Sequence, residues 1–203
     1  PALERAVELI DGGVRVEAAS NATIQTITVA GSGAGTFALG ASVSLNDISN
    51  TIDAHISGGS DVEANGSIRV LASDNSLIES LAGNLSVAGG AAVGAAIATN
   101  DIANNVTAYI SGGTTDSLNS FVEVAAGSTA TIRSLSAGVS VAGGVAVTGA
   151  VSLNKIQNTI DAHISGGAVV IGRTNVEVKA TDSSVIQSLS GQASGAGVAG
   201  IGG

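Results

Sequence analysis

A 54-residue repeat governs this sequence and limits the folds open to it. The segment NTIDAHISGG occupies residues 50–59 and returns unchanged at residues 158–167, two repeat lengths later. Midway between them, residues 104–113 read NNVTAYISGG. The framework recurs there, but the aspartate and histidine become Thr107 and Tyr109. A catalytic or metal-binding unit would keep its acid and its imidazole in each copy, so the segment predicts repeated architecture rather than repeated chemistry.

The repeat keeps one register from residue 14 to residue 203. The first copy lacks eight residues between Gly13 and Val14, and the chain comes close to four whole repeats. We therefore expect a single solenoid domain over residues 14–203, preceded by residues 1–13 as an N-terminal cap or as the end of a repeat. Columns at the 54-residue spacing include Val16, Val70, Val124 and Val178, then Ile24, Ile78, Ile132 and Ile186, and then Ser32, Ser86, Ser140 and Ser194.

Within each copy, alternation of apolar and polar residues predicts β-strands. Residues 14–18, 68–72 and 122–126 alternate in this way. Residues 46–56 alternate as well, with Asn, Ile and Ala at the even positions and polar residues at the odd ones. Because successive side chains of a strand point to opposite faces, we expect His55 and its counterpart His163 to face solvent.

Asparagine residues lie on the apolar face of this predicted strand. A buried amide is costly unless it is hydrogen-bonded, and stacked asparagines at a fixed repeat satisfy one another along a ladder. We therefore predict two structural ladders inside a β-solenoid, with an asparagine-lined polar binding site as the alternative. The ladder residues are Asn46, Asn100 and Asn154, and Asn50, Asn104 and Asn158.

The middle of the repeat is apolar at both parities. In residues 87–99 the even positions hold only Ala and Gly, which predicts a strand buried on both sides, by a sheet of this chain or of a neighbour. A helix over residues 81–98 is the rival, because Gly90 and Gly94 have the GxxxG spacing in a stretch of membrane-spanning length. Asn84 interrupts that stretch and the other copies do not keep the spacing, so no membrane span is expected.

The first residues fit a short helix. Leu3, Ala6, Val7 and Ile10 recur at helical spacing behind Pro1, which predicts an amphipathic capping helix, and a divergent last strand of a repeat is the alternative. No basic stretch precedes an apolar run, so no signal peptide is expected in this sequence, and a chain that starts with proline is expected to be processed or excised.

Composition excludes several classes of function. The net charge of -9 and the absence of a Lys/Arg cluster argue against nucleic-acid binding. Aromatic residues make up only 1% of the chain, so an aromatic-lined pocket for a small molecule is not expected. The chain has no cysteine and no nucleophile-elbow, P-loop, zincin or EF-hand motif. We therefore predict no catalytic, cofactor-binding or metal-binding residues, and no enzyme.

Two segments resemble a known group of proteins. VEVKATDSSVIQSLSG at residues 176–191 and SVAGGVAVTGAVSLNKIQNTIDAHISGG at residues 140–167 are similar to repeats of large bacterial surface exoproteins, the filamentous haemagglutinin-like and leukotoxin-like adhesins. The resemblance implies a secreted β-solenoid at the bacterial cell surface, with an adhesive or structural role and no catalytic residues. Adhesins of this kind are much longer than this chain.

Together these features predict an all-β solenoid of four in-phase 54-residue repeats, which acts as an extracellular, non-catalytic structural protein. Because open sheet edges accept further strands, we expect head-to-tail self-association into a filament. One alternative is an adhesin module that binds a host or cell-surface carbohydrate through its outer face. A membrane-active pore former and a four-bladed propeller stay open as well, and the sequence does not decide whether one repeat makes one, two or three coils.

Overall fold

The computed structural model describes residues 2–10 and 12–203, and these residues form strands, turns and no helix. The strands belong to five sheets. The first sheet contains β1 (Ala2–Ile10), β2 (Gly13–Asn21), β7 (Ile68–Asp74), β12 (Val122–Ser128) and β17 (Val176–Asp182).

The other four sheets are parallel throughout. Two of them are short: one contains β5 (Thr51–Ile56), β10 (Asn105–Ser111) and β15 (Thr159–Ser165), and the other β6 (Asp61–Ala64), β11 (Thr114–Ser117) and β16 (Val169–Gly172). The two long ones contain β3 (Thr23–Ala34), β8 (Leu77–Ala88), β13 (Thr131–Ala142) and β18 (Val185–Ala196), and β4 (Phe37–Ile48), β9 (Ala91–Ile102), β14 (Val145–Ile156) and β19 (Ala199–Gly202).

Parallel neighbours in four of the five sheets are one repeat length apart. Ile68 pairs with Val122, and Val122 pairs with Val176. Only in the β6–β11–β16 sheet does the separation of paired residues differ from the repeat length, by one residue. The strand sets β2–β6, β7–β11, β12–β16 and β17–β19 therefore stack as successive layers, so that each repeat makes one course of the chain. The prediction of an all-β chain with stacked parallel strands, as in a β-solenoid, is confirmed, and the propeller alternative is wrong.

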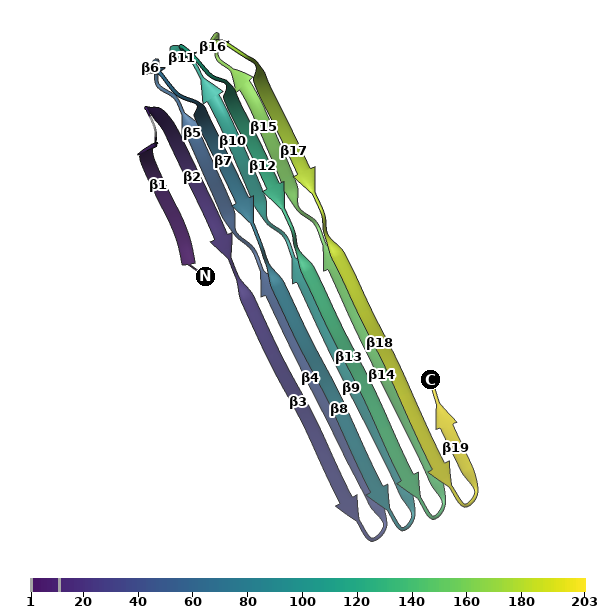
Figure 1. Ribbon diagram of the computed structural model, residues 1–203. Coiled ribbons are helices and arrows are strands. Elements are labelled where there is room, and N and C mark those ends of the chain that lie inside the picture. The colour runs from purple at the N-terminus through teal and green to yellow at the C-terminus, as the bar shows by residue number, and fades with distance from the viewer. Residues whose placement is uncertain (1, 11) are drawn as a thin grey trace.

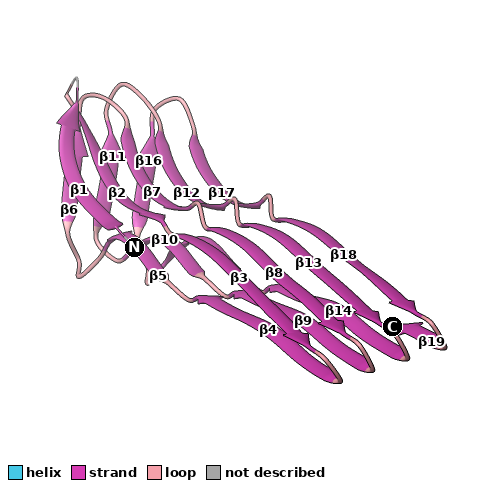
Figure 2. Cartoon of the chain, turned by 90° about the horizontal axis from the view of Figure 1, so that it is seen from below, coloured by secondary structure: helices cyan, strands magenta, loops and turns pink. Residues whose placement is uncertain are grey.

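Each layer has two parts, which we call the base and the arm (Figure 1). The base contains the short strands β5, β6, β7 and their partners, together with β1 and β2. The arm contains the two long sheets, whose strands run away from the base and return through tight turns (Figure 2). The two arm sheets pack against each other, so the arm is two sheets thick.

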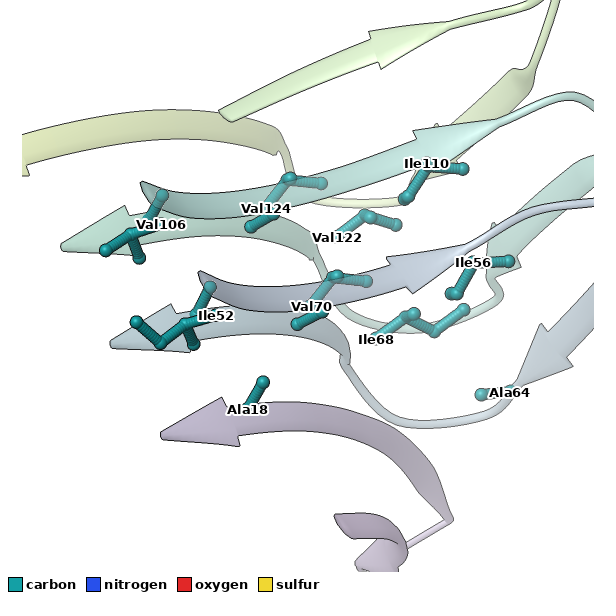
Figure 3. Packing of buried hydrophobic residues seen from close by; sticks show 14 residues of the cluster. Ala18, Ile52, Ile56, Ala64, Ile68, Val70, Val106, Ile110, Val122 and Val124 are labelled. Carbon is teal, nitrogen blue, oxygen red and sulfur yellow. The ribbon is translucent and has the colours of Figure 1, made fainter. Parts of the chain in front are cut away.

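The core of the base consists of large aliphatic side chains (Figure 3). Ile52, Ile68, Val70, Val106 and Val122 are fully buried there. Burial of a Val or Ile side chain stabilises a fold by about 1.5–3 kcal/mol. This cluster therefore supplies apolar cohesion between successive layers of the base.

The recurring Gly-Gly pairs lie in the turns that join β5 to β6 and β10 to β11. Gly58, Gly59, Gly112 and Gly113 all have φ between 71° and 76°, a left-handed conformation that favours glycine. At Gly113 a Cβ atom would also lie 2.2 Å from the carbonyl oxygen of Ser60 in the preceding layer. The repeated SGG sequence is therefore required by turn geometry and by the close stacking of layers.

The predicted N-terminal helix is wrong for the residues that the structure describes. Ala2–Ile10 form β1, which pairs antiparallel with β2 (Figure 1). A nine-residue helix is marginal by itself, whereas the free edge of β2 offers a row of backbone hydrogen-bonding groups. Hydrogen bonding to the edge of β2 therefore makes this segment a strand, although its apolar residues recur at helical spacing. Pro1, which was expected to open the helix, lies outside the described residues.

The predicted burial of residues 87–99 on both sides by sheets of this chain is also wrong. The chain turns at residues 89–90, so this stretch belongs to β8 and β9 rather than to one strand. Apart from Gly90 in the turn, its even positions point between the two arm sheets and are buried, whereas Val87 and Ile97 on the odd face are 46% and 37% exposed. None of the five sheets described above covers that odd face. Among the residues described, none belongs to a helix that is long and apolar enough to cross a membrane.

Candidate functional site: side-chain ladders across the layers

The first predicted asparagine column lies inside the arm, near the base. Asn46 donates from Nδ2 to Oδ1 of Asn100 at 2.7 Å, and Asn100 donates to Oδ1 of Asn154 at 2.7 Å. The Nδ2 group of Asn100 also donates to Oγ of Ser80 in the facing sheet, at 2.9 Å. Asn46 and Asn100 are 8% and 1% exposed. The three amides thus form one hydrogen-bonded ladder that joins the layers and ties the two arm sheets together.

The second asparagine column serves the backbone. Residues 49–50 and 103–104 separate the arm strand from the base strand in their layers. There the backbone N–H of Asn50 donates to Oδ1 of Asn104 at 2.8 Å, and the N–H of Asn104 donates to Oδ1 of Asn158 at 3.0 Å. Each side chain therefore accepts a backbone N–H from the preceding layer at a break in the strand, where such a group would otherwise be orphaned.

Asp74 is a buried carboxylate at this junction, and sequence reasoning did not single it out. It is 3% exposed and accepts hydrogen bonds from Ser76 Oγ at 2.8 Å, Asn104 Nδ2 at 2.9 Å and Ser128 Oγ at 3.2 Å. Neighbouring layers carry serine in the same column, as Ser20 and Ser128 do. A buried carboxylate that accepts three hydrogen bonds has a structural role, and this one links the second asparagine column to the serines beside it.

A ladder of rings lies on the outside of the base. The rings of His55, Tyr109 and His163 stack across three layers, with centroid separations of 4.8 and 5.2 Å and nearly parallel planes. The Nδ1 atom of His55 lies 2.7 Å from Oδ1 of Asp53, and that of His163 lies 2.9 Å from Oδ2 of Asp161. The outward direction expected for both histidines agrees with their exposure. The result is a strip of stacked rings flanked by carboxylates.

A shallow groove of about 620 Å³ crosses the layers where the β3–β8–β13–β18 sheet leaves the base. Glu79 lies in it and accepts hydrogen bonds from Gln25 at 2.8 Å and Arg133 at 2.9 Å. The Gln25 hydrogen bond, and after it the Arg133 guanidinium, lower the pKa of Glu79 below its ordinary value. The carboxylate is thus held ionised by groups from the layers on either side. The groove is lined by Gln25, Thr26, Ile27, Glu79, Ser80, Leu81, Arg133, Ser134, Leu135, Gln187, Ser188 and Leu189.

The arm inverts the usual distribution of polar and apolar side chains. Beyond a cluster of buried isoleucines next to the base, its interior holds small and polar residues, such as Ala82, Asn84, Ser86 and Ser140, all buried. Its two outer faces are apolar, and no Asp, Glu, Lys or Arg occurs in residues 26–46, 80–100, 134–154 or 188–203. The sequence could have predicted this inversion, because serine and asparagine lie at those alternate positions of the arm strands whose side chains point inward. Large exposed side chains of the arm include Ile27, Val29, Leu39, Val43, Leu45, Leu85, Val87, Val141, Val151, Leu153, Leu189 and Ile201.

Within the described part of the chain, no cluster of three or more His, Cys, Asp or Glu residues could hold a metal ion. Comparisons with models of protein families, with curated proteins and with solved structures find no match. The resemblance to the filamentous adhesins therefore stays a prediction that rests on the two quoted segments. The geometry therefore offers hydrogen-bonded and stacked ladders of side chains, apolar sheet faces and unpaired strand edges.

Proposed function

We propose that this chain is a non-catalytic, secreted structural protein, a β-solenoid of four coils, one for each repeat, that is continued by further coils into a surface filament. The observation that carries the proposal is the exposure of core columns in the last layer. Val70 and Val124 are fully buried, whereas Val178, in the same column, is 45% exposed. Likewise Ile132 is fully buried, whereas Ile186 is 47% exposed.

The backbone of the last layer reinforces this argument. β17 and β18 each pair with a strand on one side only, so a row of N–H and C=O groups faces outward. An unpaired edge beside exposed core residues is a template for another parallel layer. The opposite end of the stack carries open edges on β3 and β4 as well. A head-to-tail contact between such ends does not close, and so it produces a filament.

β1 covers part of that opposite end. It occupies the free edge of β2 in antiparallel orientation, whereas the incoming strand of a continued solenoid would be parallel. We propose that β1 is an N-terminal cap that slows addition at the base. A variant without residues 1–12 should therefore assemble faster than the full chain, as light scattering would measure. Equal rates would show that β1 is no barrier.

Electron microscopy of the purified chain tests the filament proposal. Parallel layers rise by about 4.8 Å each, so four layers predict an axial repeat of about 19 Å per chain. Filaments with this repeat are the expected result. A monomer in sedimentation velocity at every concentration tested would contradict head-to-tail assembly of this chain.

The ring ladder favours a second candidate function, the binding of a carbohydrate at a cell surface. The stacked rings, exposed at His55 and half-buried at Tyr109 and His163, offer apolar area, and the adjacent carboxylates offer hydrogen-bond acceptors to sugar hydroxyls. Saturable binding to a glycan array that Tyr109→Ala weakens and Asn105→Ala preserves is the expected result. Asn105 is a fair control because it is exposed on the same strand, at the same parity, and outside the column of the carboxylates.

A further inference from the structure

The outward face of the β4–β9–β14–β19 sheet, which we call the ridged face, has a regular relief. One ridge runs across the layers as Leu39, Val93, Val147 and Ile201, and a second one runs as Val43, Ile97 and Val151. Between the two ridges, the column of Ala41, Ala95 and Gly149 forms a groove of small residues. Ridges and groove therefore run parallel to the stacking axis.

The residues of this relief are exposed or half-buried, and none of them is charged. Leu39 is 63% exposed, Val43 52% and Val151 46%. The nearest charged column is formed by Asp47, Asp101 and Lys155, at the junction with the base. Three full layers of about nine residues and the short β19 give a flat apolar area of about 500 Å². This area lies in the range of the largest apolar patch on a typical monomer, about 300–600 Å², and such patches are often functional.

We propose that the ridged face packs against the ridged face of a second copy of this chain, so that a ridge of each copy fills the groove of the other. Side chains along a ridge repeat at the layer spacing of about 4.8 Å. A partner surface matches the ridge side chains over several layers only if its own side chains repeat at the same spacing. A second copy of this chain has that spacing, because it has the same layers. Interdigitated flat β-faces of this kind make dry, closely packed contacts.

A bilayer is the rival occupant, because the arm is apolar on both outer faces. The sheet edges argue against it for a single chain and for the two ends of a filament. β3 and β4 have free backbone edges at one end of the stack, and β18 and β19 have them at the other. Open sheet edges do not occur in contact with lipid hydrocarbon, since each unpaired N–H or C=O group costs several kcal/mol there. In water these edges are hydrated, so a second copy covers the face without that cost.

The area of the ridged face predicts how face-to-face pairing depends on end-to-end stacking of the chains. A stable interface needs about 800 Å² from each partner, more than the face of one chain offers. Two chains stacked end to end double the face to about 1,000 Å² and pass that threshold. The inference thus rests in part on the proposed filament: face pairing is weak between single chains and strong between filaments, which associate side by side.

Mass per length, measured by scanning transmission electron microscopy, tests the pairing with a matched pair of variants. Val151 and Val141 are both valines of the third layer, 46% and 45% exposed, on opposite faces of the arm. Wild-type filaments should carry two chains of 19.3 kDa for each axial repeat. Val151→Glu should halve this value, and Val141→Glu should leave it unchanged. Filaments of single mass in the wild type, or an equal effect of both variants, would overturn the pairing.

The same samples separate the two proposals. Single-mass filaments mean that stacking holds and pairing fails. Discrete dimers in sedimentation velocity that Val151→Glu dissociates mean that pairing holds and stacking fails, and monomers alone mean that both fail. Release of dye from phosphatidylcholine vesicles by the wild type, abolished by Val151→Glu, would assign the face to the bilayer and overturn the proposal. Circular dichroism that matches the wild type shows that each variant is folded.

Discussion

Asn100 is the residue at which the first asparagine ladder can be tested most sharply. It is 1% exposed and makes three side-chain hydrogen bonds, to Asn46, Asn154 and Ser80. A buried hydrogen bond contributes about 1 kcal/mol net, so Asn100→Ala should lower the free energy of unfolding by about 3 kcal/mol. The loss is not larger because Asn46 and Ser80 keep hydrogen bonds to Ser44 and Ser134.

The position in the ladder should matter. Asn154 accepts from Asn100 at 2.7 Å and donates to Ser152 at 2.9 Å, and it is only half-buried. Asn154→Ala therefore loses two bonds at a site that water can reach, and its effect should be about 1–2 kcal/mol. Asn105→Ala is the control, because Asn105 is exposed on the outer face of β10. A surface substitution of this kind changes stability by no more than about 0.5 kcal/mol.

Urea unfolding followed by far-ultraviolet circular dichroism is the suitable assay, since the chain has no Trp and one Tyr. The urea dependence of the unfolding free energy should be the same in all variants, so that midpoints report stability alone. If Asn100→Ala unfolds within about 0.5 kcal/mol of the wild type, the ladder is not a stabilising element and the reasoning fails. An effect of Asn154→Ala that exceeds that of Asn100→Ala would refute the dependence on burial.

Three further predictions concern the arm and the groove. Gly94→Ala should destabilise by about 1–3 kcal/mol in urea unfolding, because its Cβ would lie 2.1 Å from Oδ1 of Asn84, whereas Gly31→Ala meets nothing within 4 Å and should be neutral. Thr148→Val should stabilise by about 1 kcal/mol in the same assay, since the Thr148 hydroxyl is buried without a hydrogen-bond partner; a loss of stability would count against this. The pKa of Glu79 is lowered in the fold, so its stabilisation is present above the ordinary pKa of a carboxyl and is lost as pH falls through the folded-state value. Urea midpoints measured between pH 7 and pH 3 should fall less in Glu79→Gln than in the wild type, and identical pH profiles would refute this.

The sequence predicted the fold class because the same columns recur at a constant spacing. A side chain that is inward in one layer is inward in the next, so alternation within residues 46–56 was enough to place Asn46 and Asn50 on the inner face. Alternation does not report where the chain turns, because residues on both sides of a tight turn keep the same parity pattern. Consequently the sequence left open the number of courses in one repeat, and it merged parts of β8 and β9 into one strand.

The predictions for residues 2–10 and 87–99 were wrong because they depend on contacts that the sequence alone does not show. Residues 2–10 fit a helical period, but the free edge of β2 decides their conformation, and that edge exists only in the folded stack. In residues 87–99 both parities are apolar, which does not distinguish burial on two sides from burial on one. The structure resolves the ambiguity, since Asn84 and Ser86 lie between the sheets while Val87 faces outward.

The division into base and arm gives the two parts different sources of cohesion. Each Ile or Val in the base core contributes about 1.5–3 kcal/mol, whereas an alanine methyl in the arm interior contributes about 0.8 kcal/mol. Beyond the isoleucine cluster next to the base, the arm therefore gains little from its own interior, and its backbone ladders and the asparagine column hold it in register with the base. Its largest apolar side chains, such as Leu45 at 73% exposure, contribute only if something outside the chain covers them. The outer part of an arm of this composition has more to gain from a neighbour than from its own core, and that imbalance is the physical ground for the proposed assembly.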